Sequence, residues 1–339
     1  MSGGIAARIN GTLLVLMLLS IKGYPQEDAP PVRIMFYNVE NLFDIYDDTL
    51  TDDDEFLPSG IRRWNYQRYS RKINSVFKTI MAAGEWEPPA IAAFCEIENR
   101  KVLEDLIYGT NLSKYNYRII HKDSPDERGI DVCLIYRNDI AEIIDYHYFK
   151  PAELGNEFTT RYVLYARLLI DADTVHFFVN HWPSRRGGVL AGEALRTRIA
   201  ETVREKVDSL AGAHSSPKII ITGDFNATPD DRVTAILTSY SKHDISMINL
   251  SAAISGRQGT YRYIGAWETI DQVIISDALI NCSGGVFTGP GLFRVFRPDF
   301  LMKKDQKYPG LTPFSTYSGY RYQGGYSDHL PVLLDLKLR

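Results

Sequence analysis

The segment 218–231, KIIITGDFNATPDD, is the part of the chain that most constrains the fold. Its four β-branched residues, 219–222, are typical of a buried strand, and the strand ends at a glycine. Asp224 and Asn226 then stand on either side of Phe225, so their side chains point one way while Phe225 points the other. A turn alone would explain these residues, but a carboxylate and a carboxamide at the end of a buried strand also suit the binding of water or an anion.

Similar polar residues lie at the edges of six other predicted strands. They are Asn38, Glu96, Asp131, His181, Asp271 and the pair Asp328 and His329. Alone, each has an ordinary explanation as a turn residue or a hydrogen-bonded core residue. Together, the carboxylate and carboxamide oxygens suit a hard cation such as Mg²⁺. The sequence contains no P-loop and no Gly-x-Ser-x-Gly motif, so nucleotide-binding and serine-hydrolase chemistry of those types is not indicated.

The apolar segments also predict the fold class. Strands are expected at 32–37, 90–95, 132–136, 162–170, 175–179, 218–222, 267–275 and 331–338, and helices at 64–81, 99–108 and 191–210. The joins mix hairpins with helical connections, which favours layered mixed sheets over a doubly wound parallel sheet. No repeat or low-complexity linker divides residues 30–339, so we expect a single α/β domain there.

The N-terminus is predicted to be a secretory signal peptide within residues 1–25. Arg8 precedes the apolar run 13–19, which is too short to span a bilayer. The formal net charge is −4, and loss of Arg8 and Lys22 with the signal would leave −6. We therefore expect a periplasmic or secreted protein that binds a polyanion only through a local basic groove or a metal.

Two further features of the sequence have less bearing on function. The three cysteines, Cys95, Cys133 and Cys282, have no metal-site spacing, and the first two are expected in the core. In the segment 44–55, seven of twelve residues are Asp or Glu. Their spacing misses the ligand pattern of an EF-hand calcium loop, so the sequence favours a solvated acidic loop.

Seven motifs in order resemble the endonuclease/exonuclease/phosphatase superfamily. They are FYNVEN, FCEIEN, RGIDVCLIYR, FVNHWPSR, ITGDFNATP, TIDQVIIS and YSDHLPV. The superfamily includes pancreatic deoxyribonuclease, abasic-site endonucleases, inositol-phosphate phosphatases and bacterial sphingomyelinases. The segments FYNVENLFD and NHWPSRRGG are similar to sequences of its secreted bacterial branch. The resemblance implies a four-layer α/β sandwich, in which two mixed β-sheets are flanked by helices and the site lies at one edge.

The resemblance also implies a metal site and a water-activating group. Glu96 matches the main ligand of Mg²⁺ or Mn²⁺, with Asn38 and Asp328 beside it. Asp224 matches the residue that orients or deprotonates the attacking water, and Asn226 binds the same phosphate region.

Two histidines complete the implied catalytic set. His329 matches the histidine that faces the scissile phosphate, and Asp271 is its orienting carboxylate. His181 matches the second histidine, which contacts a phosphate oxygen or serves the leaving group. Asp131 is expected to pair with His181, although an alternative alignment puts Ile130 in that place.

Substrate contacts are predicted in two stretches. The first follows strand 175–179 and offers Asn180, Arg185 and Arg186, whose guanidiniums suit flanking phosphates. The second is the segment 286–326, where basic residues alternate with tyrosines. It suits a nucleic-acid groove, or equally an ordinary surface loop with tyrosines packed beneath.

Three functions remain open on the sequence alone. The first is a secreted or periplasmic, Mg-dependent phosphodiesterase that hydrolyses DNA or RNA by in-line attack of water. The second is a phosphodiesterase or phosphatase for a phospholipid or sugar phosphate, with a membrane-contacting loop built from Phe293, Val295, Phe296, Phe300 and Leu301. The third is a binding module without catalysis. No obligate protein partner is evident.

Overall fold

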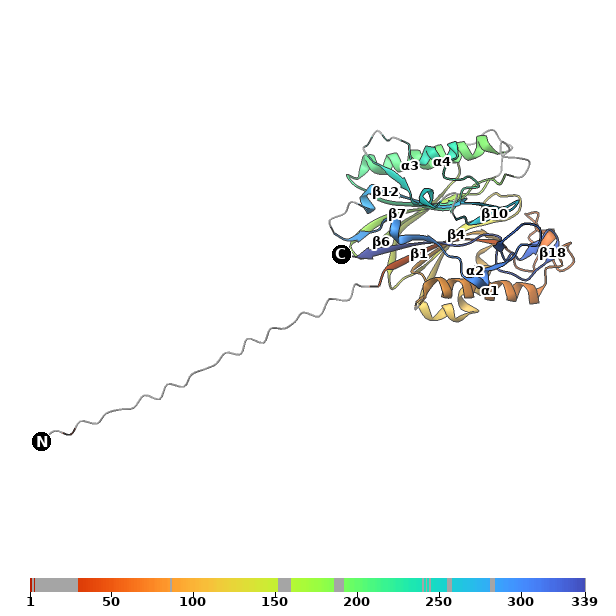
Figure 1. Ribbon diagram of the computed structural model, residues 1–339, viewed down its shortest axis with the longest axis horizontal. Helices are drawn as coiled ribbons and strands as arrows, with labels where there is room; N and C mark the ends of the chain where they lie inside the picture. The colour runs from red at the N-terminus through yellow and green to blue at the C-terminus, as the bar shows by residue number, and fades with distance from the viewer. Residues whose placement is uncertain are drawn as a thin grey trace. The chain divides into compact units, whose positions relative to one another are not determined.

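Figure 1 shows the computed structural model of the chain. It describes residues 1, 3, 30–85, 87–151, 160–185, 192–239, 241, 243, 245–254, 258–280 and 284–338. Arg186, Cys282 and nearly all of the predicted signal peptide therefore lie outside the described residues. The segment Pro31–Arg339 forms one compact unit. Among the described helices, none combines the length and the apolar character needed to cross a membrane.

Two mixed β-sheets form the centre of this unit. The first has the order β13-β19-β1-β2-β4-β3, with β14 also paired to β19. Its strands are β1 (Val32–Leu42), β2 (Ile91–Ile97), β3 (Tyr117–His121), β4 (Asp131–Arg137), β13 (Val286–Phe287), β14 (Phe293–Val295) and β19 (Val332–Leu338). The second has the order β5-β6-β7-β8-β12-β9. Its strands are β5 (Ala141–Phe149), β6 (Val163–Ile170), β7 (Asp173–His181), β8 (Lys218–Asp224), β9 (Met247–Asn249) and β12 (Asp271–Ser276).

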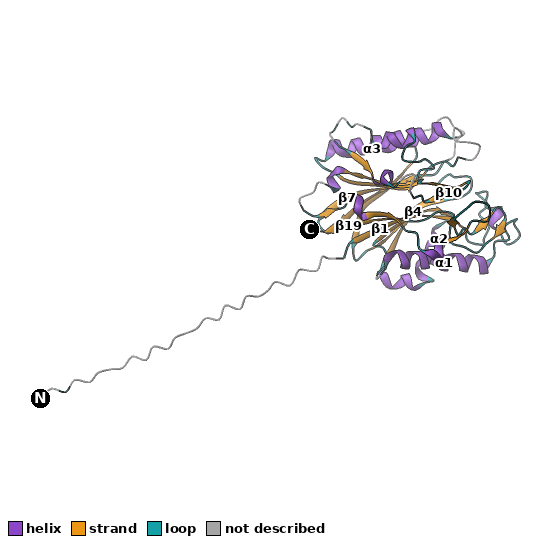
Figure 2. Cartoon of the chain, in the orientation of Figure 1, coloured by secondary structure: helices purple, strands orange, loops and turns teal. Residues whose placement is uncertain are grey.

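Helices cover the outer face of each sheet. In Figure 1, α1 (Tyr66–Gly84) and α2 (Arg100–Tyr108) lie on one side of the molecule, and α3 (Glu193–Ala213) and α4 (Arg232–Leu237) lie on the other. Figure 2 shows the strands as the two layers between them. The predicted four-layer α/β sandwich is confirmed.

The alternation of side chains along each strand explains these layers. In β1, Ile34 and Phe36 join the core between the two sheets, whereas Met35 and Tyr37 pack under α1 and α2. In the other central strands, alternate side chains likewise point into the core between the sheets or into a core beneath the helices. Strands that are buried on both faces read as continuous apolar runs, which is why the sequence revealed them.

The remaining strands form three small two-stranded ladders. These are β10 (Tyr261–Tyr263) with β11 (Ala266–Glu268), β15 (Met302–Lys304) with β16 (Leu311–Pro313), and β17 (Tyr317–Ser318) with β18 (Arg321–Tyr322). Six short 3₁₀ turns are also described, at Asp54–Phe56, Asn111–Tyr115, Leu250–Ala253, Asp277–Leu279, Pro290–Leu292 and Asp299–Leu301. The β10–β11 ladder lies beside His329, to which Tyr261 is joined by an isolated β-bridge.

The segment 286–326 is not the exposed apolar loop that a lipid-binding enzyme would need. Phe293, Val295 and Leu301 are buried in the core between the sheets, and Phe296 and Phe300 pack against that core. The sequence prediction of a membrane-contacting loop from these five residues is therefore wrong. The two described cysteines, Cys95 and Cys133, are free and buried, as predicted.

Candidate active site

Three of the predicted site residues lie side by side on the second sheet. His181 is the last residue of β7 and pairs in register with Asp224, the last residue of β8. Asp271, the first residue of β12, lies opposite Asp224 on its other side. Because β7 and β8 run parallel and β12 runs against them, the two strand ends and one strand start meet at a single edge. This register is the local reason why the predicted residues converge.

His329 is held beside Asp224 by a buried carboxylate. Its Nδ1 lies 2.8 Å from Asp271 Oδ2, and its Nε2 lies 3.8 Å from Asp224 Oδ2. Burial alone would lower the pKa of His329, but the carboxylates of Asp271 and Asp224 raise it well above the ordinary value. His329 is therefore placed to act as a charged imidazolium. Its ring also packs against the ring of Tyr261, with centroids 4.8 Å apart.

Asp224 lies at the centre of the site and is oriented by two amides. Asn38 Nδ2 donates to Asp224 Oδ2 at 3.0 Å, and the backbone N–H of Asn226 donates to Asp224 Oδ1 at 2.9 Å. Burial raises the pKa of Asp224 to about 7, and the nearby charge of Asp271 also raises it, while His329 acts in the opposite direction. A carboxylate with a pKa in this range is suited to exchange a proton with water.

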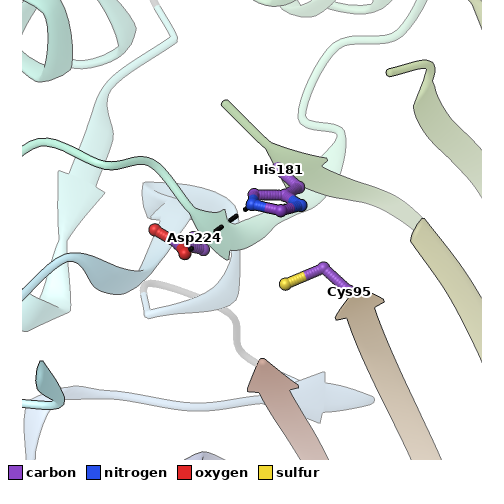
Figure 3. Close-up of side chains that lie close together, drawn as sticks. All are labelled: Cys95, His181 and Asp224. Carbon is purple, nitrogen blue, oxygen red and sulfur yellow. Dashed lines mark ion pairs between the residues drawn. The ribbon is translucent and has the colours of Figure 1, made fainter. Parts of the chain in front are cut away.

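His181 faces the same point from β7. Its Nε2 lies 3.9 Å from both Asp224 Oδ2 and Glu96 Oε1. Figure 3 shows His181 and Asp224 at the ends of adjacent strands, with the thiol of Cys95 directed toward them from β2. Burial lowers the pKa of His181 well below its usual value, and Arg161 and other nearby cations lower it further. The neutral imidazole is therefore the stable form in this geometry.

The predicted pair of Asp131 with His181 does not form. Asp131 accepts a hydrogen bond from the backbone N–H of Ser124 and lies 3.4 Å from His121 Nε2. Among the described residues, His181 Nδ1 has no hydrogen-bond partner. Asp131 also does not line the pocket that contains the other site residues. Asp131 is the first residue of β4, which pairs with β3, and β3 ends at His121. Asp131 therefore contacts His121 rather than His181.

Glu96 and Asp328 both line the pocket, and their carboxylates could hold a metal ion. Glu96 has a left-handed backbone, with φ of 62°, and its Oε2 accepts from the backbone N–H of Asn41 at 2.9 Å. Burial raises the pKa of Asp328, and the charge of Glu96 also raises it. Two carboxylates that repel each other at the wall of a polar pocket fit a divalent cation held by oxygen ligands.

Asn38 has a different role from the predicted one. It is 1% exposed, its Nδ2 is bound to Asp224, and its Oδ1 accepts from the backbone N–H of Glu40 at 2.9 Å. It does not line the pocket. The structure therefore assigns Asn38 to the positioning of Asp224 rather than to a free ligand position.

The site opens into a polar pocket of about 500 Å³. Two arginines that the sequence reasoning missed line its wall. Arg128 Nη2 donates to Asn41 Oδ1 at 2.5 Å, and Arg161 donates to the backbone carbonyls of His181 and Trp182 at 3.1 Å. The two arginines lie in loops that are distant in sequence, and no sequence motif contains Arg161. Arg128 is the first residue of the motif RGIDVCLIYR, which could have indicated its place at the site.

The predicted substrate contacts are corrected in two places. Asn180 is fully buried and holds Trp182, whose Nε1 donates to Asn180 Oδ1 at 3.2 Å, so the prediction that it binds substrate is wrong. Arg185 lines the pocket, but its guanidinium is paired with Asp231 at 3.0 Å and Glu268 at 3.3 Å. Its charge is thus largely neutralised within the protein. No residue of the described part of the segment 286–326 lines the pocket.

Comparison with known proteins identifies the family. The model of the Endonuclease/Exonuclease/phosphatase family matches residues 33–338. The chain belongs to this family. Its members are metal-dependent hydrolases of phosphoric esters. At the site, one ligand atom from each of Asp224, Asp271 and His329 lies within 4.8 Å of the other two, a spacing that could hold a metal. No curated protein matches the sequence.

Solved structures of the family share the fold at low sequence identity. The mannosyl-6-phosphatase of Bacteroides thetaiotaomicron is 16% identical, with a TM-score of 0.58 over 90% of this chain and 99% of that chain. The human Nocturnin catalytic domain with bound sulfate is 16% identical, with a TM-score of 0.55 over 92% and 96%. D. rerio TDP2 complexed with a single-strand DNA product is 10% identical, with a TM-score of 0.55 over 90% and 98%.

Proposed function

We propose that this protein is a secreted or periplasmic phosphodiesterase that hydrolyses nucleic acid with Mg²⁺ or Mn²⁺. The observation that supports it best is the convergence of Asp224, His329 and His181 on one point of a pocket that also contains Glu96 and Asp328. Acid, base and metal-ligand groups at one place are what water attack on a phosphate ester requires. The secreted or periplasmic location is part of the proposal and is supported by the sequence pattern of Arg8 and the apolar run 13–19.

The chain's own residues account for proton transfer and charge stabilisation. Asp224 orients the attacking water and accepts its proton, because its carboxylate is held by Asn38 and Asn226. His329 stabilises the charge that develops on the phosphate oxygens, since Asp271 keeps its imidazole protonated and in place. When bound at Glu96 and Asp328, a divalent cation supplies Lewis-acid stabilisation of the phosphate. No covalent nucleophile is needed.

Nucleic acid is favoured by the chemistry of the pocket wall. Arg128 brings positive charge to the pocket, which suits a phosphate beside the cleaved bond. Arg161 also lines the pocket, but its guanidinium is paired with Asp126 at 3.0 Å. Tyr261 and the exposed Tyr263 line the pocket from β10, where an unpaired base can stack on an aromatic ring. The acidic overall charge of −4 limits binding to this local surface.

A sugar phosphate is the second candidate. A pocket of about 500 Å³ is large enough to enclose a small ligand, and one solved structure of the same fold is a mannosyl-6-phosphatase. An enzyme of this type would cleave monoesters, whose terminal phosphate enters the pocket alone. The lipid alternative is not supported by the five residues proposed to contact a membrane, because three are buried and the half-buried Phe296 and Phe300 pack against the core.

A substrate panel distinguishes these functions. The purified mature protein is assayed with Mg²⁺ on plasmid DNA, single-stranded DNA and RNA oligonucleotides, mannose 6-phosphate and sphingomyelin vesicles. We expect oligonucleotide cleavage with a kcat/KM at least about a hundredfold above that for the monoester. Release of phosphate from the sugar monoester without cleavage of any nucleic acid would replace the nuclease proposal with the phosphatase. Turnover of vesicle lipid alone would restore the lipid enzyme.

Catalysis is expected to require a divalent cation. Chelation with EDTA should abolish hydrolysis, and Mg²⁺ or Mn²⁺ should restore it. In Glu96→Gln, the metal concentration for half-maximal activity should rise at least about tenfold, because a charged oxygen ligand is lost. Glu142→Gln, an exposed change on β5, is the matched control and should behave as wild type. Full activity of a metal-stripped protein in excess EDTA would contradict the mechanism.

Arg128→Ala is expected to raise KM for oligonucleotides roughly tenfold, with a smaller effect on kcat. A guanidinium that binds phosphates away from the reacting bond acts about equally in the ground state and the transition state. The salt dependence of KM should also weaken. Arg118→Ala removes the same charge from an exposed position outside the pocket, and KM should not change. Equal KM values for the two variants would exclude Arg128 from substrate binding.

A further inference from the structure

The acidic loop that follows β1 contains a compact group of carboxylates. One carboxylate oxygen from each of Asp47, Asp53 and Asp54 lies within 4.8 Å of the other two. Calcium–oxygen bonds are about 2.3–2.6 Å long, so ligands of one Ca²⁺ lie up to about 5 Å apart. The three side chains thus already have the spacing of ligands around a single cation. The sequence pattern did not predict this, because it lacks the spacing of an EF-hand loop.

Asp53 is the buried member of the group, and its bonding is incomplete. Asp53 is only 2% exposed. Its Oδ2 accepts a hydrogen bond from the backbone N–H of Asp48 at 3.1 Å. Its Oδ1 is buried and has no hydrogen-bond partner in the part of the chain that the structure describes. A buried carboxylate oxygen without a donor is costly, so such an atom normally marks a missing water or ion. Since further carboxylates surround it, a cation is the ligand that it fits.

The charges around Asp53 are not balanced by the protein. None of the residues Asp47, Asp48, Asp52, Asp53 and Asp54 forms an ion pair with any Lys, Arg or His in the described parts of the chain. Burial raises the pKa of Asp53, and the negative charge of Asp47 raises it further. This repulsion makes the loop unfavourable without a counter-ion and provides a reason for binding one.

The loop is attached to the segment that carries Arg128. The backbone N–H of Asp52 donates to the carbonyl of Glu127 at 2.7 Å. Gly129 has φ of +64°, and a Cβ at that position would lie 2.9 Å from side-chain atoms of Thr51. Thr51 and Asp52 thus contact the two residues on either side of Arg128, which lines the active-site pocket. A fixed conformation of the acidic loop would therefore also fix the backbone at Arg128.

We propose that Asp47, Asp53 and Asp54 form a structural Ca²⁺ site that fixes the acidic loop against residues 127–129. Calcium suits this loop better than magnesium, because two of the three ligands are exposed side chains on an irregular backbone. Ca²⁺ accepts six to eight oxygen ligands in flexible geometry, and water completes its shell, whereas Mg²⁺ demands a near-ideal octahedron. The site is separate from the metal ligands Glu96 and Asp328 and does not depend on the substrate proposed above.

The test measures binding and stability rather than activity. The full mature chain carrying Glu96→Gln, which weakens the catalytic metal site, is stripped with EDTA and titrated with Tb³⁺, whose luminescence neighbouring aromatic rings sensitise. Ca²⁺ is then used to displace the Tb³⁺. We expect one saturable site per chain with a Ca²⁺ Kd of about 10⁻⁴–10⁻³ M, the range of extracellular calcium modules. About 10 mM Ca²⁺ should raise Tm by roughly 2–4 °C, more than the same concentration of Mg²⁺.

Loop variants identify the ligands. Asp53→Asn should weaken Ca²⁺ binding at least about tenfold, and the double variant Asp47→Asn/Asp54→Asn, which changes only exposed side chains, should do the same without loss of folding. Asp52→Asn removes the same charge from the same loop outside the group, and Ca²⁺ affinity should stay within about twofold. Equal weakening by Asp52→Asn, no saturable site below about 10 mM, or an equal Tm increase with Mg²⁺ would each overturn the proposal.

Discussion

Replacing Asp224 with Asn is expected to lower kcat by about 10²–10⁴-fold, the range for loss of a general base. The change keeps the size of the side chain, but the carboxamide has a single oxygen, so only one of the two donors, Asn38 Nδ2 or the backbone N–H of Asn226, keeps its acceptor. It removes the basic oxygen that faces His329 and His181, at 3.8 and 3.9 Å. Initial rates at saturating Mg²⁺ measure the effect, and circular dichroism checks that the variant is folded.

A matched control separates this effect from a general loss of charge. Asp171 lies in the turn between β6 and β7 with φ of 54°, a conformation that Asn adopts readily, so Asp171→Asn should be neutral. If folded Asp224→Asn kept more than about a tenth of wild-type kcat, Asp224 would not be the general base. A result in which KM rises and kcat is unchanged would assign it to substrate binding instead.

The sequence predicted the central strands because burial on both faces leaves a clear signal. The run 219–222 is apolar or β-branched on both sides of the strand, since Ile219 and Ile221 face helices and Ile220 faces the other sheet. The edge strand β5 gave no such signal, because about half of its residues are exposed and polar ones interrupt the run. The small ladders within 261–322 were missed because strands of two or three residues have no measurable periodicity.

The errors at the site come from pairings that a local pattern cannot show. Arg185 looked like a phosphate ligand, but it is neutralised by Asp231 and Glu268, which lie 46 and 83 residues farther along the chain. Asn180 could have been excluded from the sequence. Consecutive residues of a strand point to opposite faces, so a residue next to His181 must face the helices, as Asn180 and Trp182 do. Arg161 could be assigned to the pocket only from the placement of the loops, whereas Arg128 begins the motif RGIDVCLIYR in the sequence.

The second large effect is expected at the pair of His329 and Asp271. His329→Ala should lower kcat by about 10²–10⁴-fold, because the imidazolium beside Asp224 is lost. Asp271→Asn should cost less, since the imidazole stays in place while its Nδ1 loses the charged partner at 2.8 Å. Because Asp271 acts through His329, the double variant should be no slower than His329→Ala alone.

The double-mutant cycle is decisive because it tests how the two residues depend on each other. Asp271 is fully buried, and within the described chain its Oδ2 contacts His329 while its Oδ1 has no hydrogen-bond partner. A carboxylate in this position has no direct route to the substrate, so its effect on kcat must pass through the imidazole. His147→Ala, an exposed change on β5, is the matched control and should leave kcat unchanged. If the two losses multiplied in the double variant, Asp271 would act independently of His329, and the assignment of His329 as the charged group oriented by Asp271 would fail.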